Sequence, residues 1–180
     1  MSIIELKGVT KEYGQGHTLV QALKPTDFQL EAGQFVAIIG PSGSGKTTLL
    51  TLLGHLQTPS KGQIFLHGKD TSQLKEKERA ALRFNDFGFI LQASNLIPFL
   101  KIEDQFQLID RLSKKERTDL DSLIELLDLK GTLKQYPKEL SGGERQRAAI
   151  ARALYNSPDI ILADEPTASL DTERAKRVVH

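Results

Sequence analysis

The chain has 180 residues, of which 39% are hydrophobic, and its formal net charge at pH 7 is +1. This length suits about one domain with its own core, and the small charge provides no broad basic field that would indicate nucleic acid as the main partner. The sequence has no cysteine, which excludes a disulfide framework. Its first residues do not have the pattern of a secretory leader, and no apolar run approaches the roughly 18–20 residues of a membrane span, so we expect no direct membrane span.

The first third of the sequence predicts a β-rich layer around a glycine loop. Runs rich in apolar and β-branched residues predict strands at Ile3–Tyr13, Thr26–Leu30, Phe35–Ile39 and Gly62–Leu66. The third run reads FVAII, which is apolar throughout, and we expect it to form a buried parallel strand.

A phosphate-binding loop follows that run. Its glycines allow successive backbone N–H groups to point at the β- and γ-phosphates of a nucleotide, and the N-terminus of the helix expected up to Gly54 adds positive potential there. The residues that we assign to the nucleotide are Gly40, Pro41, Ser42, Gly43, Ser44, Gly45, Lys46, Thr47 and Thr48. Lys46 would neutralise the phosphate oxygens, and the Thr47 hydroxyl would be a ligand of Mg²⁺.

The middle of the chain turns from strands to helices. We expect a helix at Lys75–Arg83, a strand at Phe87–Leu91 and mainly helix between about residues 94 and 155. Four apolar residues share one face of a predicted helix that ends near Lys130-Gly131, because they lie at positions i, i+3, i+4 and i+7. They are Leu120, Leu123, Ile124 and Leu127.

A second glycine-lined helix start lies at Ser141-Gly142-Gly143-Glu144. Ser141 and Glu144 have the spacing of a capping box, but a cap does not need two glycines. Gly142 and Gly143 remove side chains from the helix start, so that a bulky anion can reach its N–H groups. One ATP can use both helix starts of this sequence if two subunits meet head to tail, which predicts a two-fold symmetric homodimer.

Two adjacent carboxylates follow a predicted buried strand at Ile160–Ala163. Side chains of neighbouring residues on a strand point to opposite sides, so Asp164 and Glu165 can divide two tasks. We expect Asp164 to hold the Mg²⁺ shell and Glu165 to polarise the attacking water. The alternative is a solvated strand end without a catalytic role.

These motifs resemble the nucleotide-binding domain of ABC (ATP-binding cassette) transporters, from the first residues to about Asp171. The Walker A match is Gly40–Thr48, the signature match is Leu140–Gln146, and the Walker B match is Ile160–Glu165. The resemblance implies that Tyr13 stacks on adenine and that Gln92 senses Mg²⁺ and the γ-phosphate. It also implies that Asp171, in a Ser-Leu-Asp match to the D-loop, lies at the dimer interface.

The resemblance further implies the fold, the domain plan and the partners. The fold is an α/β P-loop NTPase with a mainly parallel sheet core, an N-terminal antiparallel β layer and a helical signature subdomain. We expect one ABC ATPase domain over 1–180, with a core of about 1–93 and 156–180 and a helical subdomain of about 94–155. Its cofactors would be ATP and Mg²⁺. Its partner would be an integral-membrane permease, and its location the cytoplasm, peripheral at the inner face of the cell membrane.

Finer similarity indicates one branch of the family. The stretch DEPTASLD at Asp164–Asp171 resembles macrolide-exporter and lipoprotein-release ATPases, and the stretch Gly88–Leu100 most resembles bacterial haem-efflux ATPases. The apolar side chains within that stretch either fill a gap between subdomains or form an exposed groove for a coupling helix of the permease. They are Leu96, Ile97, Phe99 and Leu100.

The sequence departs from the family pattern near its C-terminus. The family has a further strand after the D-loop helix and then a switch histidine. None of His17, His55, His67 and His180 follows such a strand, so we expect the domain to be incomplete at its C-terminus.

Two functions remain open from the sequence. In the first, ATP closes the dimer, the permease changes state, and hydrolysis directed by Glu165 resets the complex. In the second, the chain is a non-hydrolytic module that regulates a membrane complex through ATP-dependent association. Glu165, Gln92 and Asp171 favour the first function, and the missing histidine favours the second.

Overall fold

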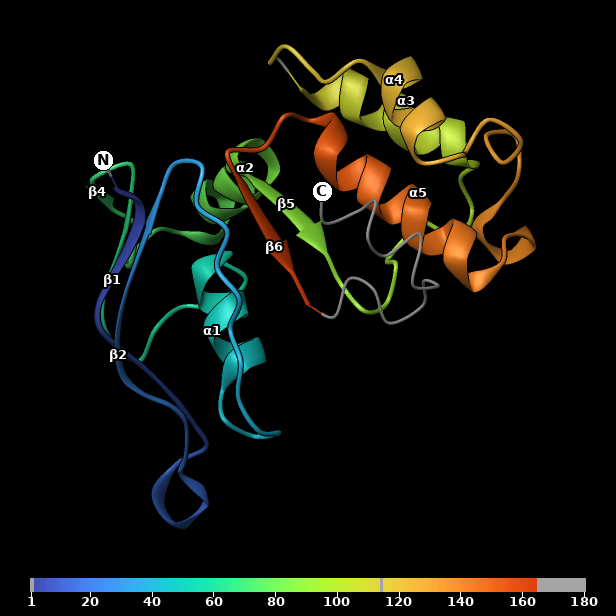
Figure 1. Cartoon of the computed structure of the whole chain (residues 1–180). Coiled ribbons are helices and arrows are strands. Elements are labelled where there is room, and N and C mark those ends of the chain that lie inside the picture. Colours follow the sequence, from blue (N-terminus) through green and yellow to red (C-terminus); the bar gives the residue numbers. More distant parts are fainter. Residues whose placement is uncertain (1, 114, 165–180) are drawn as a thin grey trace. The chain divides into compact units, whose positions relative to one another are not determined.

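The computed structural model describes residues 2–113 and 115–164 (Figure 1). The chain divides into two compact units, Met1–Arg83 and Phe84–His180. The glycine loop therefore belongs to the first unit, and the Ser141 helix start belongs to the second.

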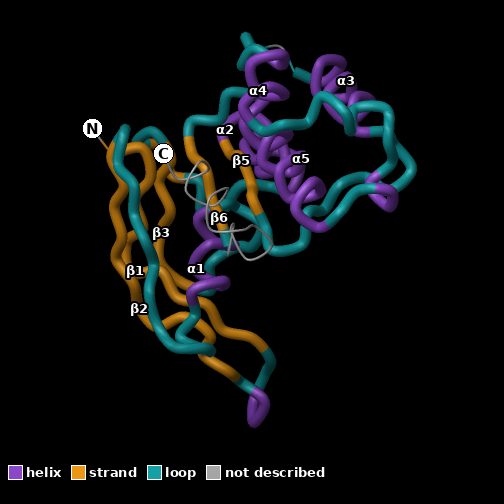
Figure 2. Tube along the Cα trace, turned by 45° about the vertical axis from the view of Figure 1, so that its right-hand side comes forward, coloured by secondary structure: helices purple, strands orange, loops and turns teal. Residues whose placement is uncertain are grey.

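An antiparallel sheet with the strand order β2-β1-β3-β4 dominates the first unit (Figure 2). Its strands are β1 (Ser2–Tyr13), β2 (Val20–Glu31), β3 (Lys61–Leu66) and β4 (Lys69–Asp70), with the 3-10 helix η1 (Gly16–Thr18) between β1 and β2. The strands predicted at Ile3–Tyr13 and Gly62–Leu66 are confirmed. The strand predicted at Thr26–Leu30 is the second half of β2. Pro25 interrupts the strand pattern of the sequence within β2, and it is tolerated there because β2 is an edge strand.

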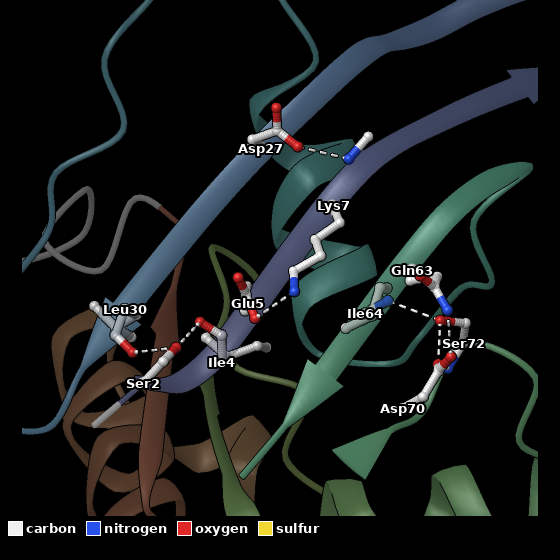
Figure 3. Close-up of polar contacts among 11 residues, drawn as sticks. Ser2, Ile4, Glu5, Lys7, Asp27, Leu30, Gln63, Ile64, Asp70 and Ser72 are labelled. Atoms are coloured by element: carbon white, nitrogen blue, oxygen red, sulfur yellow. Dashed lines mark hydrogen bonds and ion pairs between the residues drawn. The ribbon is translucent and has the colours of Figure 1, made fainter. Parts of the chain in front are cut away.

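A bulge in β1 keeps both halves of this strand turned to the core. Leu6 and Val9 are both buried, although strict alternation would place residues three apart on opposite faces. The pairing with β2 shifts register between Leu6 and Val9, so an extra residue restores the inward direction. The N–H of Gly8, whose φ is 56°, donates to Asp27 Oδ1 at 2.6 Å, the bond drawn at Asp27 in Figure 3. The Asp27 side chain thus satisfies a donor at the site of the bulge.

Side-chain hydrogen bonds close the hairpin of β3 and β4 (Figure 3). Ser72 Oγ accepts from the N–H of Ile64 at 2.7 Å and donates to Asp70 Oδ1 at 2.5 Å. The hydroxyl and the backbone N–H of Ser72 lower the pKa of the Asp70 carboxyl group. The edge strand β4 is only two residues long, and such short edges limit pairing with other chains.

The helix predicted after the glycine loop is α1 (Lys46–Leu53). Leu49, Leu52 and Leu53 are buried, and the N–H of Gly54 donates to Leu50 O at 2.9 Å, so the helix ends where the sequence predicts.

The strand predicted at Phe35–Ile39 is wrong for this structure. The segment forms no strand, and Phe35 is 82% and Ile39 is 92% exposed. Its composition is that of a buried strand, but a parallel strand needs neighbouring strands in the same direction. The sheet of the first unit is antiparallel, and the described first unit offers this segment no strand partner.

A buried histidine joins the end of α1 to the segment after β4. His55 is 2% exposed, its Nε2 lies 2.7 Å from Thr71 Oγ1, and its Nδ1 lies 3.1 Å from Leu53 O. Burial lowers the pKa of His55, the Leu53 carbonyl partly opposes this, and the guanidinium groups of Arg79 and Arg83 lower it further. The neutral imidazole is therefore the form that fits the folded chain.

We expect the free energy of unfolding to fall as the pH drops below about 6.5, the ordinary pKa of histidine. Because the pKa of His55 is lower in the folded than in the unfolded chain, the unfolded chain takes up the proton first. The stabilisation by neutral His55 is thus present above about pH 6.5, and it is lost as the pH falls towards the pKa of His55 in the folded chain. Urea unfolding across this pH range should show a smaller loss of unfolding free energy for His55→Gln than for the wild type. His17→Gln, at an exposed turn, should keep the wild-type slope of unfolding free energy against pH. Equal slopes in all three proteins would contradict this role of His55.

The second unit combines a two-stranded parallel sheet with helices. The boundary between the units falls within helix α2 (Glu76–Asp86), which leads into β5 (Phe87–Ile90). The later elements are α3 (Ile102–Leu112), α4 (Leu120–Leu126), the 3-10 helix η2 (Pro137–Glu139), α5 (Gly142–Tyr155) and β6 (Ile160–Ala163). Strands β5 and β6 pair from Phe87↔Ile160 to Ile90↔Ala163. The predicted helix at Lys75–Arg83 and the strands at Phe87–Leu91 and Ile160–Ala163 are confirmed.

One hydrophobic core holds the helices of the second unit together. Phe106 of α3 meets Tyr155 of α5 edge to face, with ring centroids 5.3 Å apart. Leu123, Ile124 and Leu127 are buried in this core and Leu120 packs against it, so the predicted apolar face is confirmed. The predicted end near Lys130 is wrong because Asp128, with a φ of 52°, leaves the right-handed helical conformation directly after α4.

No helix within the described ranges combines the length and the apolar character that crossing a bilayer requires.

Candidate nucleotide-binding site

The glycine loop of the first unit is a tight turn that only glycine permits at its final position. Gly45 is the N-cap of α1 with a φ of 91°, and a Cβ atom there would lie 2.6 Å from Ala22 O. Gly43 also has a positive φ, of 78°, but open space around it. The N–H of Ser44 donates to Pro41 O at 3.3 Å. The close approach of Gly45 to β2 thus fixes where the helix starts.

The lysine of this loop lies across the turn. Lys46 Nζ donates to Gly40 O at 2.8 Å and to Pro41 O at 2.9 Å. Thr47 is exposed, and Thr48 O accepts a hydrogen bond from the Thr51 hydroxyl at 2.8 Å within α1. The loop therefore presents an ammonium group, a hydroxyl group and the start of a helix together, which suits a polyphosphate.

Tyr13 is the last residue of β1 and is 41% exposed. Its hydroxyl group donates to Gln57 Oε1, and Lys11 Nζ lies 5.2 Å from its ring centroid. An exposed ring held in this way can act as a stacking surface.

The helix start at Ser141 is capped and open. Ser141 Oγ accepts from the N–H of Glu144 at 3.3 Å, and Glu144 Oε2 accepts from the N–H of Ser141 at 2.7 Å, which confirms the predicted capping box. Ser141 and Gly142 are exposed, and a Cβ atom at Gly142 would meet nothing nearer than Arg145, at 4.0 Å. Together with Gly143, these residues leave the first N–H groups of α5 accessible to an anion.

The parallel pairing of β5 and β6 brings two predicted magnesium residues to one edge. Ile90 pairs with Ala163, and the N–H of Asp164 donates to Ile90 O at 2.9 Å. Gln92 follows β5 by two residues and is exposed. Gln92 and Asp164 therefore lie at the same carboxyl ends of parallel strands, while Glu165 and Asp171 lie outside the described residues.

Helix α5 also holds the segment that follows β5. Arg152 donates to Asn95 O at 2.7 Å and to Ser94 O at 3.3 Å, and Gln146 Nε2 lies 3.5 Å from Leu91 O. These contacts could not be predicted from the sequence, and neither could the bond from Tyr13 to Gln57. Nothing in the periodicity marks them, because each joins residues more than 40 positions apart.

The family model described as ABC transporter matches residues 23–168. The chain belongs to the ABC transporter family. This ABC cassette is 44% identical over 180 residues to a protein of Staphylococcus haemolyticus named as a hemin import ATP-binding protein, HrtA; the match covers 98% of the chain and 81% of that protein. The name agrees with the expected resemblance to haem-efflux ATPases in the compound, haem, but it gives import as the direction.

Solved structures confirm the predicted fold class and the assignment to ABC-type ATPases. The cassette matches a dimeric structure of MJ0796, described as a bacterial ABC transporter cassette, with a TM-score of 0.89, 36% identity and coverage of 97% of this chain and 79% of that chain. A second dimeric MJ0796 structure, a post-hydrolysis state bound to ADP and Pi, matches with a TM-score of 0.88, the same identity and the same coverage.

Proposed function

We propose that this ABC cassette is the ATP-hydrolysing subunit of a transporter in which a separate membrane permease carries the substrate. ATP would bring two copies together head to tail, and hydrolysis would release them. One observation carries this proposal: the chain has two open, glycine-lined helix starts, at Gly45–Lys46 and at Ser141–Gly142. The dimeric state of the MJ0796 cassette supports the same arrangement.

Each half of the proposed dimer supplies different residues to one nucleotide. From one subunit, Tyr13 would stack on the base, and the loop residues would bind the phosphates: Gly40, Pro41, Ser42, Gly43, Ser44, Gly45, Lys46, Thr47 and Thr48. From the other subunit, Ser141, Gly142 and Gly143 would bind the γ-phosphate, and Asp171 would line the interface.

The chemistry of each predicted donor suits Mg²⁺. Thr47 offers a hydroxyl oxygen, Gln92 an amide oxygen and Asp164 a carboxylate oxygen, and hard oxygen donors are those that Mg²⁺ prefers. The shared edge of β5 and β6 supports a joint role for Gln92 and Asp164. When bound, the ion would offset the negative charge of the phosphates.

The hydrolytic step rests on Glu165 and Gln92. Glu165 would accept a proton from the attacking water, and Gln92 would orient this water towards the γ-phosphate. General-base assistance of this kind contributes about 10²- to 10⁴-fold to the rate.

The expected subdomains, location and partner follow from the proposed role as a transporter subunit. Residues 94–155 would form the helical subdomain, residues 1–93 and 156–180 would form the core, and the cassette would lie in the cytoplasm at the inner face of the membrane. Phe99 is 76% exposed while Leu96 is buried, which supports a contact between Phe99 and the permease. We propose export of haem or a related compound, although the name of the staphylococcal relative gives import.

Glu165→Gln should form a dimer only when Mg-ATP is present. The substitution removes the general base but keeps the size of the side chain, so the ATP-bound dimer should persist instead of being hydrolysed. Light scattering with and without Mg-ATP measures the change in mass.

The matched control adds Gly142→Glu, which places a negative charge at the start of α5, where a side chain has room. This double variant should bind ATP and remain monomeric. ATP binding without dimer formation in Glu165→Gln alone would overturn the proposed mechanism and leave only a nucleotide-binding chain.

A further inference from the structure

We propose that Gln57 and Lys11 position the Tyr13 ring and so determine how strongly the site holds a base, as distinct from a polyphosphate. The inference rests on the proposed function, because it takes Tyr13 as the base-stacking residue. Both residues act through Tyr13 and are positioning residues. Neither is among the site residues predicted from the sequence.

The Tyr13 ring is held at its edge and over one face. Its hydroxyl group donates to Gln57 Oε1, which fixes the far end of the ring and so restricts the swing of the whole side chain about its first side-chain torsion. Lys11 Nζ lies over the ring at 5.2 Å from the centroid and is itself fixed by donating to Thr58 O at 2.8 Å. An ammonium group over one face leaves the opposite face for a stacking partner.

Gln57 and Thr58, which holds Lys11, both belong to the segment that follows the phosphate-loop helix. The N–H groups of Leu56 and Gln57 donate to Thr51 O, at 2.9 and 3.2 Å, so this segment is tied to the last turn of α1. Helix α1 begins at Lys46 and has eight residues, which corresponds to about 12 Å. One short rigid element therefore carries the phosphate-binding lysine at its start and the support of the aromatic ring beyond its end.

This arrangement lowers the cost of ordering the ring when a base arrives. A tyrosine at the exposed end of a hairpin would otherwise lose rotational freedom on stacking, and side chains ordered in advance avoid that loss. The ligand class is a nucleoside triphosphate with a stacking base. The same hydrogen bond could instead only stabilise the β1–β2 hairpin, in which case its loss would weaken the binding of every ligand alike.

Calorimetric titration with ATP and with inorganic tripolyphosphate, which lacks the base, separates these roles. Gln57→Leu should weaken ATP binding by about two- to tenfold, the range expected for one hydrogen bond, and leave tripolyphosphate binding unchanged. Tyr13→Phe, which keeps the ring, should behave in the same way. The double variant should lose no more ATP affinity than either single variant, because each substitution removes the same hydrogen bond.

Two further variants complete the design. Gln57→Glu keeps an acceptor for the tyrosine hydroxyl group and should retain ATP binding close to the wild-type value, which also controls for folding. Lys11→Met should weaken ATP binding selectively, again without an effect on tripolyphosphate.

The proposal is overturned if Gln57→Leu leaves ATP binding unchanged, if both ligands weaken equally, or if the Gln57 and Tyr13 effects add. A wild-type protein that binds tripolyphosphate as tightly as ATP would instead contradict the base-stacking role of Tyr13, and thus the proposed function itself. The two failures are therefore distinguishable.

Discussion

Gly45→Ala should weaken ATP binding by at least about 30-fold, a loss of about 2 kcal/mol. Gly45 has a φ of 91°, which costs a residue with a side chain about 1–3 kcal/mol. In addition, the new methyl group would lie 2.6 Å from the backbone oxygen of Ala22. The start of α1 must therefore move away from β2, and the N–H groups that would face the phosphates must move with it. Titration calorimetry with ATP measures the loss.

The matched control for this substitution is Gly68→Ala. Gly68 has a φ of 76°, but a methyl group there would have no neighbouring atom within 4 Å, and the residue lies outside the loop. This variant should lose stability through the same backbone strain and bind ATP like the wild type. If Gly45→Ala and Gly68→Ala bind ATP equally well, the contact with Ala22 does not determine the geometry of the loop.

Lys46→Met should weaken ATP binding by about 10- to 100-fold, the range expected for hydrogen bonds from a charged donor. Methionine keeps most of the aliphatic stem of lysine and removes the ammonium group. That group lies within hydrogen-bonding distance of Gly40 O and Pro41 O, so it is held over the loop where the phosphates would bind. The effect should shrink at high salt because the interaction is between charges.

Lys7→Met is the matched control for this charge removal. Lys7 lies in the same unit, pairs with Glu5 at 3.3 Å and is exposed, but it belongs to β1 and not to the loop. Its removal should leave ATP binding unchanged. A similar loss in both variants would mean that the general charge of the unit, and not the position of Lys46, attracts ATP.

The elements that could be predicted from the sequence are those in which local chemistry decides the conformation. The capping box at Ser141 and Glu144 joins residues three apart, and the glycine loop needs no distant partner to be recognised. The apolar face of α4 follows from helical periodicity alone. In each case, the information lies within a few residues.

The elements that could not be predicted depend on distant partners or on single backbone angles. Phe35–Ile39 has the composition of a strand, but strand formation requires a paired neighbour, and the sequence does not say whether one lies alongside. Helix α4 ends early because Asp128 adopts a positive φ, which few sequence signals announce. The support of Tyr13 by Gln57 joins residues 44 positions apart, and no pattern connects them.

The hydrogen bonds from α5 to the segment after β5 have a consequence for how two bound nucleotides would influence each other. The start of α5 at Ser141 would meet the nucleotide of the partner subunit. Arg152 and Gln146 hold the backbone on both sides of Gln92, which would serve the subunit's own nucleotide. If α5 shifts when its start contacts the partner's nucleotide, it would therefore move Gln92 at the nucleotide of its own subunit. In such a dimer, occupancy of one site would be thermodynamically linked to the state of the other, and the linkage would be reciprocal.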